Sequence, residues 1–302
     1  MSIKIVTHSQ HFHIDELFAI VFLKMYVDKN IDVVRTRDEK LLSEYKTDKD
    51  VWVIDVGGEY DPEMKNFDHH QKSFKGSWED GTPLSSCGLI WNYLKENNLL
   101  SQHMNGETID KIEKDIVKKV DKQDNGIEFW QEAYFISIYN TKTNDEKKLK
   151  YSFDRALEVT NDFYKNLFGV IRRSLRAERE VKKVIDKSKE FENVIMMDSH
   201  NMDMMKILHS YTDKTIAVLP YKGKEIWKIC SITNGNSFSK RSEMPKDWLG
   251  LSGKELETVS GVKGLEFCHK AGFMCVYKGS KEEAINIANN IYLYNLACMR
   301  KQ

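Results

Sequence analysis

Apolar positions in the first sixty residues alternate between short runs and a helical repeat. The first run covers residues 3–6, and apolar residues then recur at helical spacing over residues 14–25, giving a helix with one apolar face. Further runs over residues 31–35 and 51–54 follow, with a short helix expected around residues 41–45. The run at 51–54 is continuously apolar, as in buried parallel strands. This alternation predicts a mainly parallel sheet covered by helices.

The rest of the chain contains a long helical part and a second strand-rich part. One helix is expected to begin at Ser85 or Ser86, and another to end at Asn125-Gly126. Residues 151–191 are helical in pattern and rich in charge. The later strand-like segments are residues 194 onward, 215–219, 226–232 and 267–276, followed by a helix over 281–299.

These patterns predict an α/β protein with two domains. Residues 1–150 are expected to form a mainly parallel-sheet domain, residues 151–192 a helical connector, and residues 193–302 a smaller α+β domain.

Composition limits the partners and the location. Of 302 residues, 46 are Lys or Arg and 46 are Asp or Glu, so no bulk attraction to nucleic acid or to an anionic membrane is expected. The five cysteines lack Cys-x-x-Cys spacing, which fits a reducing compartment. The N-terminus has no signal or transit pattern, and the apolar run over 17–23 is too short to span a bilayer. We therefore expect a soluble intracellular protein, cytoplasmic or nuclear if the source is eukaryotic, with no membrane partner.

Candidate metal ligands gather where strands are predicted to end. Five of the nine histidines lie in the first 70 residues. With neighbouring carboxylates, they follow three predicted strands: His8, His11, His13, Asp15 and Glu16; Asp55; and Asp68, His69 and His70. The carboxyl ends of parallel strands meet at one edge of the sheet, where ligands bind. Imidazoles and carboxylates there could hold two divalent ions for phosphoryl transfer, with Asp55 expected to bridge them.

Three questions about this set stay open. Asp15 and Glu16 alone could simply stabilise the start of a helix. Strict alternation along a strand would place His69 on the opposite side from Asp68 and His70, so the strand must end or twist there. Asp121 and Asp124 both lie near a helix end, and we favour Asp124 because it directly precedes the Asn-Gly turn.

Another metal motif is present in part. His11-Phe12-His13-Ile14-Asp15 resembles the His-x-His-x-Asp-His zinc motif of metallo-β-lactamase-type hydrolases, with Glu16 in place of the last histidine. That motif assigns no role to Asp55 or to residues 68–70, which makes it the weaker hypothesis.

Several short stretches of the sequence that contain the candidate ligands or lie between them form a distinctive combination. They are Thr7-His8 with Phe12-His13-Ile14-Asp15-Glu16, Val34-Arg35-Thr36-Arg37-Asp38, Asp55-Val56-Gly57-Gly58, Phe67-Asp68-His69-His70-Gln71, Leu84-Ser85-Ser86-Cys87-Gly88, and Val120 with Asp124-Asn125-Gly126. They resemble the signature blocks of the melanocyte-proliferating-gene exonuclease family, within the DHH phosphoesterase superfamily. The likeness continues through Ser237-Phe238 with Arg241 and through residues 261–273, so it covers essentially the whole chain.

This resemblance implies a DHH-type N-terminal domain and 3′-to-5′ exonuclease action on single-stranded RNA, through a hydroxide activated by two Mn²⁺ or Mg²⁺ ions. It implies that His8, His13 and Asp55 hold one ion, and that Asp15, Asp55, His69 and Asp124 hold the other. Asp55 would therefore serve both ions. His70 would lie beside the scissile phosphate, with Asp68 orienting the imidazoles. The substrate-binding residues of the second domain would be Arg241, His269, Lys270 and Gly272.

One departure from the superfamily pattern affects the metal. Many members have an aspartate where His13 stands, and a neutral ligand in that place favours Mn²⁺ over Mg²⁺. The rival enzymatic hypotheses are action on short oligonucleotides, cyclic dinucleotides or pyrophosphate, and the non-enzymatic one is a silent RNA-binding protein. No obligate protein partner is evident, and a homodimer is compatible with the sequence.

Overall fold

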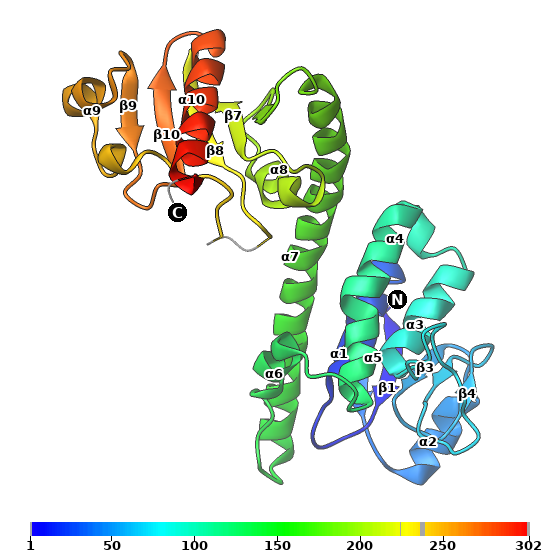
Figure 1. Cartoon of the computed structure of the whole chain (residues 1–302). Helices are drawn as coiled ribbons and strands as arrows, with labels where there is room; N and C mark the ends of the chain where they lie inside the picture. The colour runs from blue at the N-terminus through cyan, green and yellow to red at the C-terminus, as the bar shows by residue number, and fades with distance from the viewer. Residues whose placement is uncertain (1, 224, 236–238, 301–302) are drawn as a thin grey trace. The chain divides into compact units, whose positions relative to one another are not determined.

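The computed structural model describes residues 2–223, 225–235 and 239–300. It divides into two compact units, residues 1–171 and 172–302, and each contains its own five-stranded sheet (Figure 1). The helix α7, Glu146–Lys187, contributes residues to both units and contains most of the expected connector, residues 151–192, whose boundaries stay predictions. Among the described residues, no helix is both long enough and apolar enough to cross a membrane.

The first unit has a mainly parallel sheet, as predicted. Its strands are β1 (Ile3–Thr7), β2 (Ile31–Arg35), β3 (Val51–Ile54), β4 (Tyr60–Asp61) and β5 (Asn66–Phe67), in the order β2-β1-β3-β5-β4. All neighbouring pairs are parallel except β4 with β5. The apolar run at β3 is buried at all four residues, which confirms its interior position.

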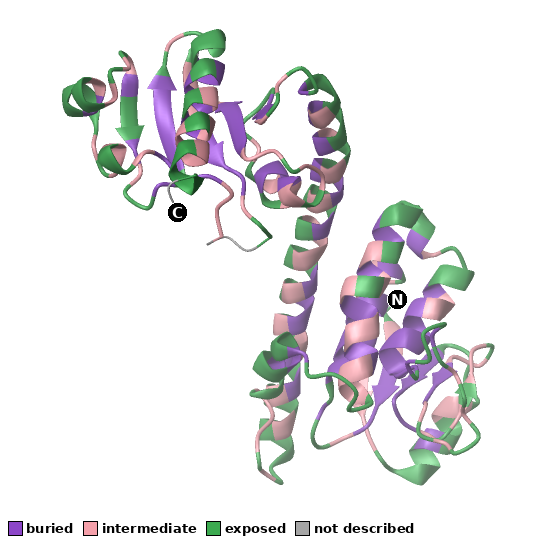
Figure 2. Cartoon of the chain, in the orientation of Figure 1, coloured by how far each residue is buried: buried purple, intermediate pink, exposed green. Residues whose placement is uncertain are grey.

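The helix α1, Ile14–Tyr26, is more deeply buried than expected. A helix with one apolar face was predicted, whereas every residue from Ile14 to Leu23 is buried (Figure 2). The sheet alone does not account for this, because α3 (Ser86–Glu96), α5 (Lys118–Asp124) and α6 (Gln131–Ser137) also contact the helix. Phe18 packs against Trp130, Phe163 and Tyr164. A helix surrounded in this way is apolar on all sides over residues 17–23, whereas the buried Asp15 and Glu16 of its first turn belong to a polar cluster.

The remaining helices of the first unit agree with the predicted stops and starts. Asp38 caps α2 (Glu39–Lys46) by accepting from Leu41 N, and Ser85 precedes α3. The helix expected before Asn125-Gly126 consists of α4 (Gly106–Ile112), a π-helical turn η2 (Glu113–Val117) and α5. A 3₁₀ turn, η1 (Leu100–Gln102), precedes it.

The second unit is α+β, as predicted. Its strands are β6 (Val194–Met196), β7 (Ile216–Pro220), β8 (Ile226–Ser231), β9 (Leu265–Cys268) and β10 (Met274–Lys278), in the order β6-β7-β8-β10-β9. Only β6 and β7 pair in parallel. The single strand-like segment expected over 267–276 was wrong. Residues 267–276 instead contain the end of β9, a turn and the start of β10. The chain reverses at this β9–β10 turn, where Gly272 adopts φ +66°.

Helices cover both faces of this second sheet. Val194 and Met196 face the helix α10 (Lys281–Met299), whereas Ile195 and Met197 pack with Val181 and other apolar residues of α7. This alternation is the side-chain pattern of a strand buried on both faces. The other helical elements are α8 (Met202–Ile207), η3 (Leu208–Ser210), η4 (Lys246–Trp248) and α9 (Gly253–Ser260).

The packing of α1 leads to a stability prediction. Phe18→Ala should lower the free energy of unfolding by about 3–5 kcal/mol, because it removes a fully buried ring from between three aromatic neighbours. Phe135→Ala is the control, because the Phe135 side chain is exposed and should cost little. Urea denaturation of the two variants measures the difference, and equal losses would contradict the buried position of Phe18.

Candidate metal centre

The first residues of the site follow the ends of three adjacent parallel strands. His8 follows β1, Asp55 follows β3 and Asp68 follows β5. Because β1, β3 and β5 are neighbours with the same direction, these residues leave the sheet at the same edge. Strand β5 ends at Phe67, so His69 and His70 lie in a loop and are free of strand alternation. This confirms that the strand ends before the two histidines.

Asp55 lies at the centre of the cluster. Its Oδ2 atom is 3.2 Å from His8 Nε2 and 4.0 Å from His13 Nδ1. Its Oδ1 atom is 3.3 Å from His69 Nε2 and 3.6 Å from His70 Nδ1. Each carboxylate oxygen therefore faces a different pair of histidines, which is the geometry that a bridging carboxylate needs. Asp55 adopts φ 58°, a left-handed conformation that aspartate tolerates better than most residues.

Charged neighbours determine the protonation of this buried group. Burial of Asp55 favours its neutral form, but His69 and His8 outweigh burial and hold the pKa of Asp55 below its usual range. For His8, burial opposes the charged imidazolium, yet Asp55 and Glu16 raise its pKa to about 10. The cluster therefore combines anionic and cationic groups at one buried point.

Two further carboxylates approach from α1 and from the end of α5. His69 Nε2 lies 3.8 Å from Asp15 Oδ2 and 3.5 Å from Asp124 Oδ2. Burial, followed by the nearby Asp55 and Asp124 carboxylates, raises the pKa of Asp15. Ser86 N donates to Asp15 Oδ2 at 3.2 Å and helps to hold this carboxylate in place. Like charges this close need a cation or a proton among them.

Buried polar atoms that lack a hydrogen bond show whether metal ions would fit in this cluster. Among the described residues, four buried atoms of this cluster have no hydrogen-bond partner of acceptable geometry: His8 Nε2, Asp15 Oδ1, Asp55 Oδ2 and His69 Nε2. Buried polar atoms in proteins are nearly always hydrogen-bonded, so this concentration calls for a ligand. Imidazole nitrogens and carboxylate oxygens are the donors that Mn²⁺ and related divalent ions accept. The residues therefore fit divalent metal ions.

The described residues contain three overlapping groups whose ligand atoms lie within 4.8 Å of one another. They are His8, His13 and Asp55; Asp55, His69 and His70; and His13, Asp15 and Asp124. The first group is the set predicted for one ion. The residues predicted for the other ion, Asp15, Asp55, His69 and Asp124, are all brought together around His69. Their roles as ligands stay predictions.

Asp68 contacts His70 and leaves His69 to other partners. Its Oδ1 atom accepts from the His70 backbone N–H at 3.1 Å and lies 2.8 Å from His70 Nδ1, while Gly58 N donates to Oδ2 at 2.6 Å. The Asp68 hydrogen bond raises the pKa of His70. Over half of the His70 side chain is exposed, so its ring is held in place but open to a ligand.

Asp121 and Asp124 have different surroundings. Asp121 is buried and accepts hydrogen bonds from Trp78 Nε1, from Ser85 N and Oγ, and from Gly88 N, at 2.5–3.2 Å. A Cβ atom at position 88 would lie 2.2 Å from Asp121 Oδ2, so only glycine allows this approach. Burial raises the pKa of Asp121 to about 7, against the opposing effect of these donors. Asp121 therefore anchors the start of α3, and Asp124 is the one that lies beside His69.

Two residues named from the sequence support the site in a way that was not predicted, since Glu16 was considered only as a candidate carboxylate and Ser86 only as a possible helix start. Glu16 is buried and lies 3.1 Å from His8 Nε2, and it accepts hydrogen bonds from Thr7 Oγ1 and His13 N. Ser86 Oγ lies 3.3 Å from Asp55 Oδ1. Their signals were present, since Glu16 stands three residues after the helix-capping His13 and Ser86 begins α3.

His11, by contrast, does not take part in the site. Its side chain is exposed, and it is absent from the three ligand groups found among the described residues. The zinc-hydrolase alternative depends on this histidine, so the geometry disfavours it.

The guanidinium of Arg241 is used to join loops of the second unit. It donates to the backbone oxygens of His209 and Lys214 at 3.0 and 3.1 Å, and also to Thr212 O. Its Nε atom donates to Asn234 Oδ1 at 2.9 Å. Phosphate binding by Arg241 therefore stays a prediction. Ser237 and Phe238, which precede it in the matching block, lie outside the described residues.

The other predicted substrate residues lie in the β9–β10 turn. His269 is partly exposed and Lys270 is exposed, while Gly272 is buried. His269 Nδ1 accepts from Ala271 N at 3.1 Å, and the His269 ring lies 4.3 Å from the Phe273 ring. Lys240 Nζ donates to Ala271 O at 2.7 Å, so this turn contacts the segment that carries Arg241. Their substrate-binding role stays a prediction.

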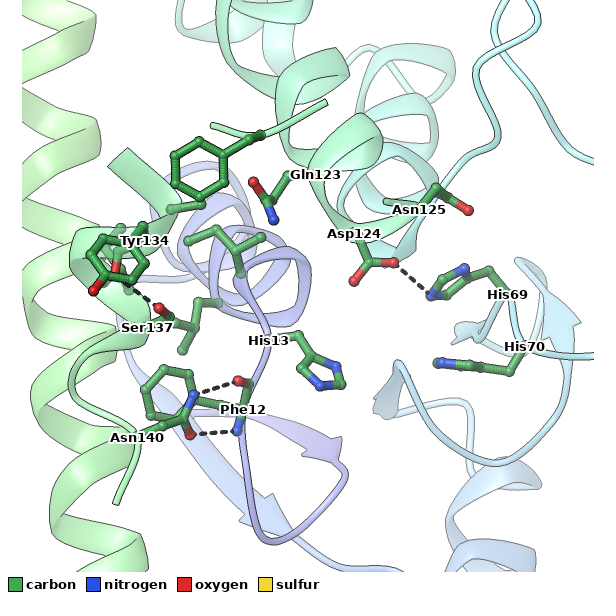
Figure 3. A pocket seen from close by; sticks show the side chains of 15 residues that line it. Phe12, His13, His69, His70, Gln123, Asp124, Asn125, Tyr134, Ser137 and Asn140 are labelled. Atoms are coloured by element: carbon green, nitrogen blue, oxygen red, sulfur yellow. Dashed lines mark hydrogen bonds and ion pairs between the residues drawn. The ribbon is translucent and has the colours of Figure 1, made fainter. Parts of the chain in front are cut away.

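A cavity of about 630 Å³ opens beside the metal cluster within the first unit. Figure 3 shows Asp124, His69 and His70 on one side of it, Tyr134 and Ser137 on the other, and His13 between them. Asn140 exchanges two hydrogen bonds with the backbone of Phe12, at 3.0 and 2.9 Å, and so fixes the cavity wall to the loop before α1. This volume is in the range of pockets that hold small ligands.

Sequence comparison provides the family. The family model MYG1_exonuc, described as "Uncharacterised protein family (UPF0160)", matches residues 4–291. The chain belongs to this MYG1 exonuclease family. A MYG1 protein of Chlamydia pneumoniae is 32% identical, with 90% of both chains covered. The human MYG1 exonuclease is 30% identical, covering 94% of this chain and 84% of its own. The family membership inferred from the sequence blocks is therefore confirmed.

Two solved structures show weaker likeness to this MYG1-family chain. A pGpG-specific phosphodiesterase, PggH of Vibrio cholerae, covers 98% of this chain and 99% of its own, at 15% identity and a TM-score of 0.29. RecJ of Thermus thermophilus, in complex with Mn²⁺, covers 95% of this chain and 52% of its own, at 11% identity and a TM-score of 0.23. Scores this low support no inference about activity.

The different surroundings of Asp121 and Asp124 lead to a paired prediction. Asp124→Asn should weaken Mn²⁺ binding at least about 10–100-fold, the range for losing an outer-shell partner of a metal ligand, with little loss of stability. Asp121→Asn should instead cost about 1–3 kcal/mol of unfolding free energy, because an amide nitrogen would face buried donors, while Mn²⁺ binding stays close to wild type. Calorimetric Mn²⁺ titration and urea denaturation of both variants measure these effects, and the reverse pattern would contradict the assignment.

Proposed function

We propose that this chain is a metal-dependent phosphodiesterase that removes nucleotides from the 3′ end of single-stranded RNA. The observation that carries the proposal is the position of Asp55, whose two oxygens face separate pairs of histidines at the edge of a parallel sheet. Membership of the MYG1 exonuclease family supports a hydrolase, and the human relative's name, MYG1 exonuclease, supports exonuclease action.

Two divalent ions would be held by His8, His13 and Asp55, and by Asp15, Asp55, His69 and Asp124. Mn²⁺ is the favoured ion and Mg²⁺ the alternative, because histidine nitrogens contribute to both groups. When bound, such ions stabilise charge on the attacking and leaving oxygens and lower the pKa of water. The buried carboxylates and Glu16 hold the imidazoles in the orientation that the ions need.

His70 is placed to contact the phosphate itself. Its Nδ1 atom is held by Asp68 at 2.8 Å, so the other ring nitrogen is left for the substrate. A charged imidazole there would neutralise a phosphate oxygen or give a proton to the leaving oxygen. Arg241, His269, Lys270 and Gly272 are proposed to bind the rest of the RNA.

The activity prediction uses a 5′-labelled single-stranded RNA with Mn²⁺. Wild-type protein should give a ladder that shortens from the 3′ end, EDTA should abolish it and added Mn²⁺ should restore it. The triple variant Asp68→Ala, His69→Ala, His70→Ala should be slower by more than about 100-fold, because it removes a proposed ligand and a proposed acid together. Denaturing gels over a time course measure the rates.

His11→Ala is the matched control, because His11 is an exposed histidine outside the cluster and its loss should leave the rate unchanged. A DNA strand of the same sequence tests selectivity for RNA. Absence of RNA cleavage by folded, Mn²⁺-loaded wild-type protein would contradict the proposal. Short oligonucleotides, cyclic dinucleotides and pyrophosphate would then be tested, and a silent RNA-binding protein would remain if none reacted.

A further inference from the structure

A group of large apolar side chains is exposed on α6 and on the residues that flank it. Phe129 is 70% exposed and Tyr134 is 55% exposed, and Ile127, Phe135 and Ile138 are exposed to a similar degree. Isolated exposed apolar residues are ordinary, but several within twelve residues mark a surface that binds something. No role in the metal cluster accounts for them.

Two of these rings line the same cavity as the metal cluster. Phe129 and Tyr134 share it with His13, His69, His70 and Asp124. Figure 3 shows Tyr134 across the cavity from His69 and His70. The centroids of the Phe129 and Tyr134 rings are 6.2 Å apart and their planes are tilted by 49°, so the two rings form one contiguous aromatic surface. We refer to Phe129 and Tyr134 as the aromatic wall.

The chemical groups that line the cavity indicate which class of ligand fits it. One side offers imidazoles and carboxylates suited to metal ions and a phosphate, and the other offers exposed aromatic faces. A ligand that satisfies both sides has a phosphate and a flat apolar ring within one unit, which describes a nucleotide. Pyrophosphate has no part that would cover the wall. A protein partner covering the wall would leave the metal side of the same cavity unused.

Gln123 adds a polar group at this cavity. Its Oε1 atom accepts from Trp130 N at 2.6 Å, which fixes the amide and leaves its nitrogen as a donor. A donor close to a stacking surface can contact the edge of a nucleobase, whichever base is present.

We propose that the aromatic wall stacks the nucleobase at the 3′ end of single-stranded RNA, so that the adjoining phosphate reaches the metal cluster. This inference rests on the proposed function and identifies where that substrate is held. Stacking is tolerant of sequence because every base has an aromatic face. The wall therefore favours a terminal nucleotide without selecting one base.

The test compares two 5′-labelled RNAs in the presence of Mn²⁺, one ending in adenosine and one ending in an abasic ribose. Phe129→Ala and Tyr134→Ala should each raise KM for the adenosine-ended RNA about 5- to 150-fold, with kcat changing less. With the abasic RNA, the ratio of variant to wild-type KM should fall towards one. Tyr134→Phe should restore the wild-type KM because it keeps the ring. Tyr151→Ala is the control, since Tyr151 is an equally exposed ring on α7, outside the cavity lining.

Fluorescence anisotropy with the same RNAs in EDTA separates this inference from the proposed function. If wild-type protein cleaves neither RNA, the proposed function fails, and the wall is then judged by whether the alanine variants weaken binding of the adenosine-ended RNA alone. Equal effects of the alanine variants on both RNAs, no effect on either, or no RNA binding by wild type would overturn the inference. If sedimentation of Phe129→Ala then shows altered self-association, the wall contacts a second copy of the chain.

Discussion

The Asp55 carboxylate is the group on which the site depends. It is buried, it follows the central strand β3, and its two oxygens face His8 with His13 and His69 with His70. Burying a carboxylate is costly unless charged partners surround it. The histidines meet that need in part, and the buried atoms around them that lack a hydrogen bond could be satisfied by metal ions. The left-handed backbone of Asp55 is a local strain of the kind found at functional sites.

Around this centre, a layer of buried hydrogen bonds holds the ligands in position. Glu16 orients His8, Asp68 orients His70, and Ser86 contacts both Asp15 and Asp55. Ser86 is held in turn because Asp121 anchors the start of α3 through Ser85 and Gly88. The contacts that Glu16, Asp68 and Ser86 make determine how precisely the site residues are placed, so their loss is expected to affect metal binding without removing a ligand, whereas Asp121 stabilises α3 itself.

Much of the first unit could be predicted from sequence because its strands are short apolar runs and its ligands follow them directly. Asp55 and His69 were placed together for that reason, whereas Asp124, at a helix end, was chosen because it precedes the Asn-Gly turn and matches the family pattern. Other features depend on distant contacts. The complete burial of α1 arises from packing by α3, α5, α6 and α7, and the β9–β10 turn depends on one glycine conformation. The aromatic wall was missed because exposed rings give no periodic signal, and only the fold shows that they line the cavity.

In the proposed function, two divalent ions would share the Asp55 carboxylate. Counting bound Mn²⁺ by calorimetry and recording the electron paramagnetic resonance spectrum of the loaded protein test it most directly. Wild-type protein should bind two Mn²⁺ per chain with the magnetic coupling of ions about 3.5–4 Å apart, and Asp55→Asn should lose that coupling. A single, uncoupled Mn²⁺ in the wild-type protein would contradict the account.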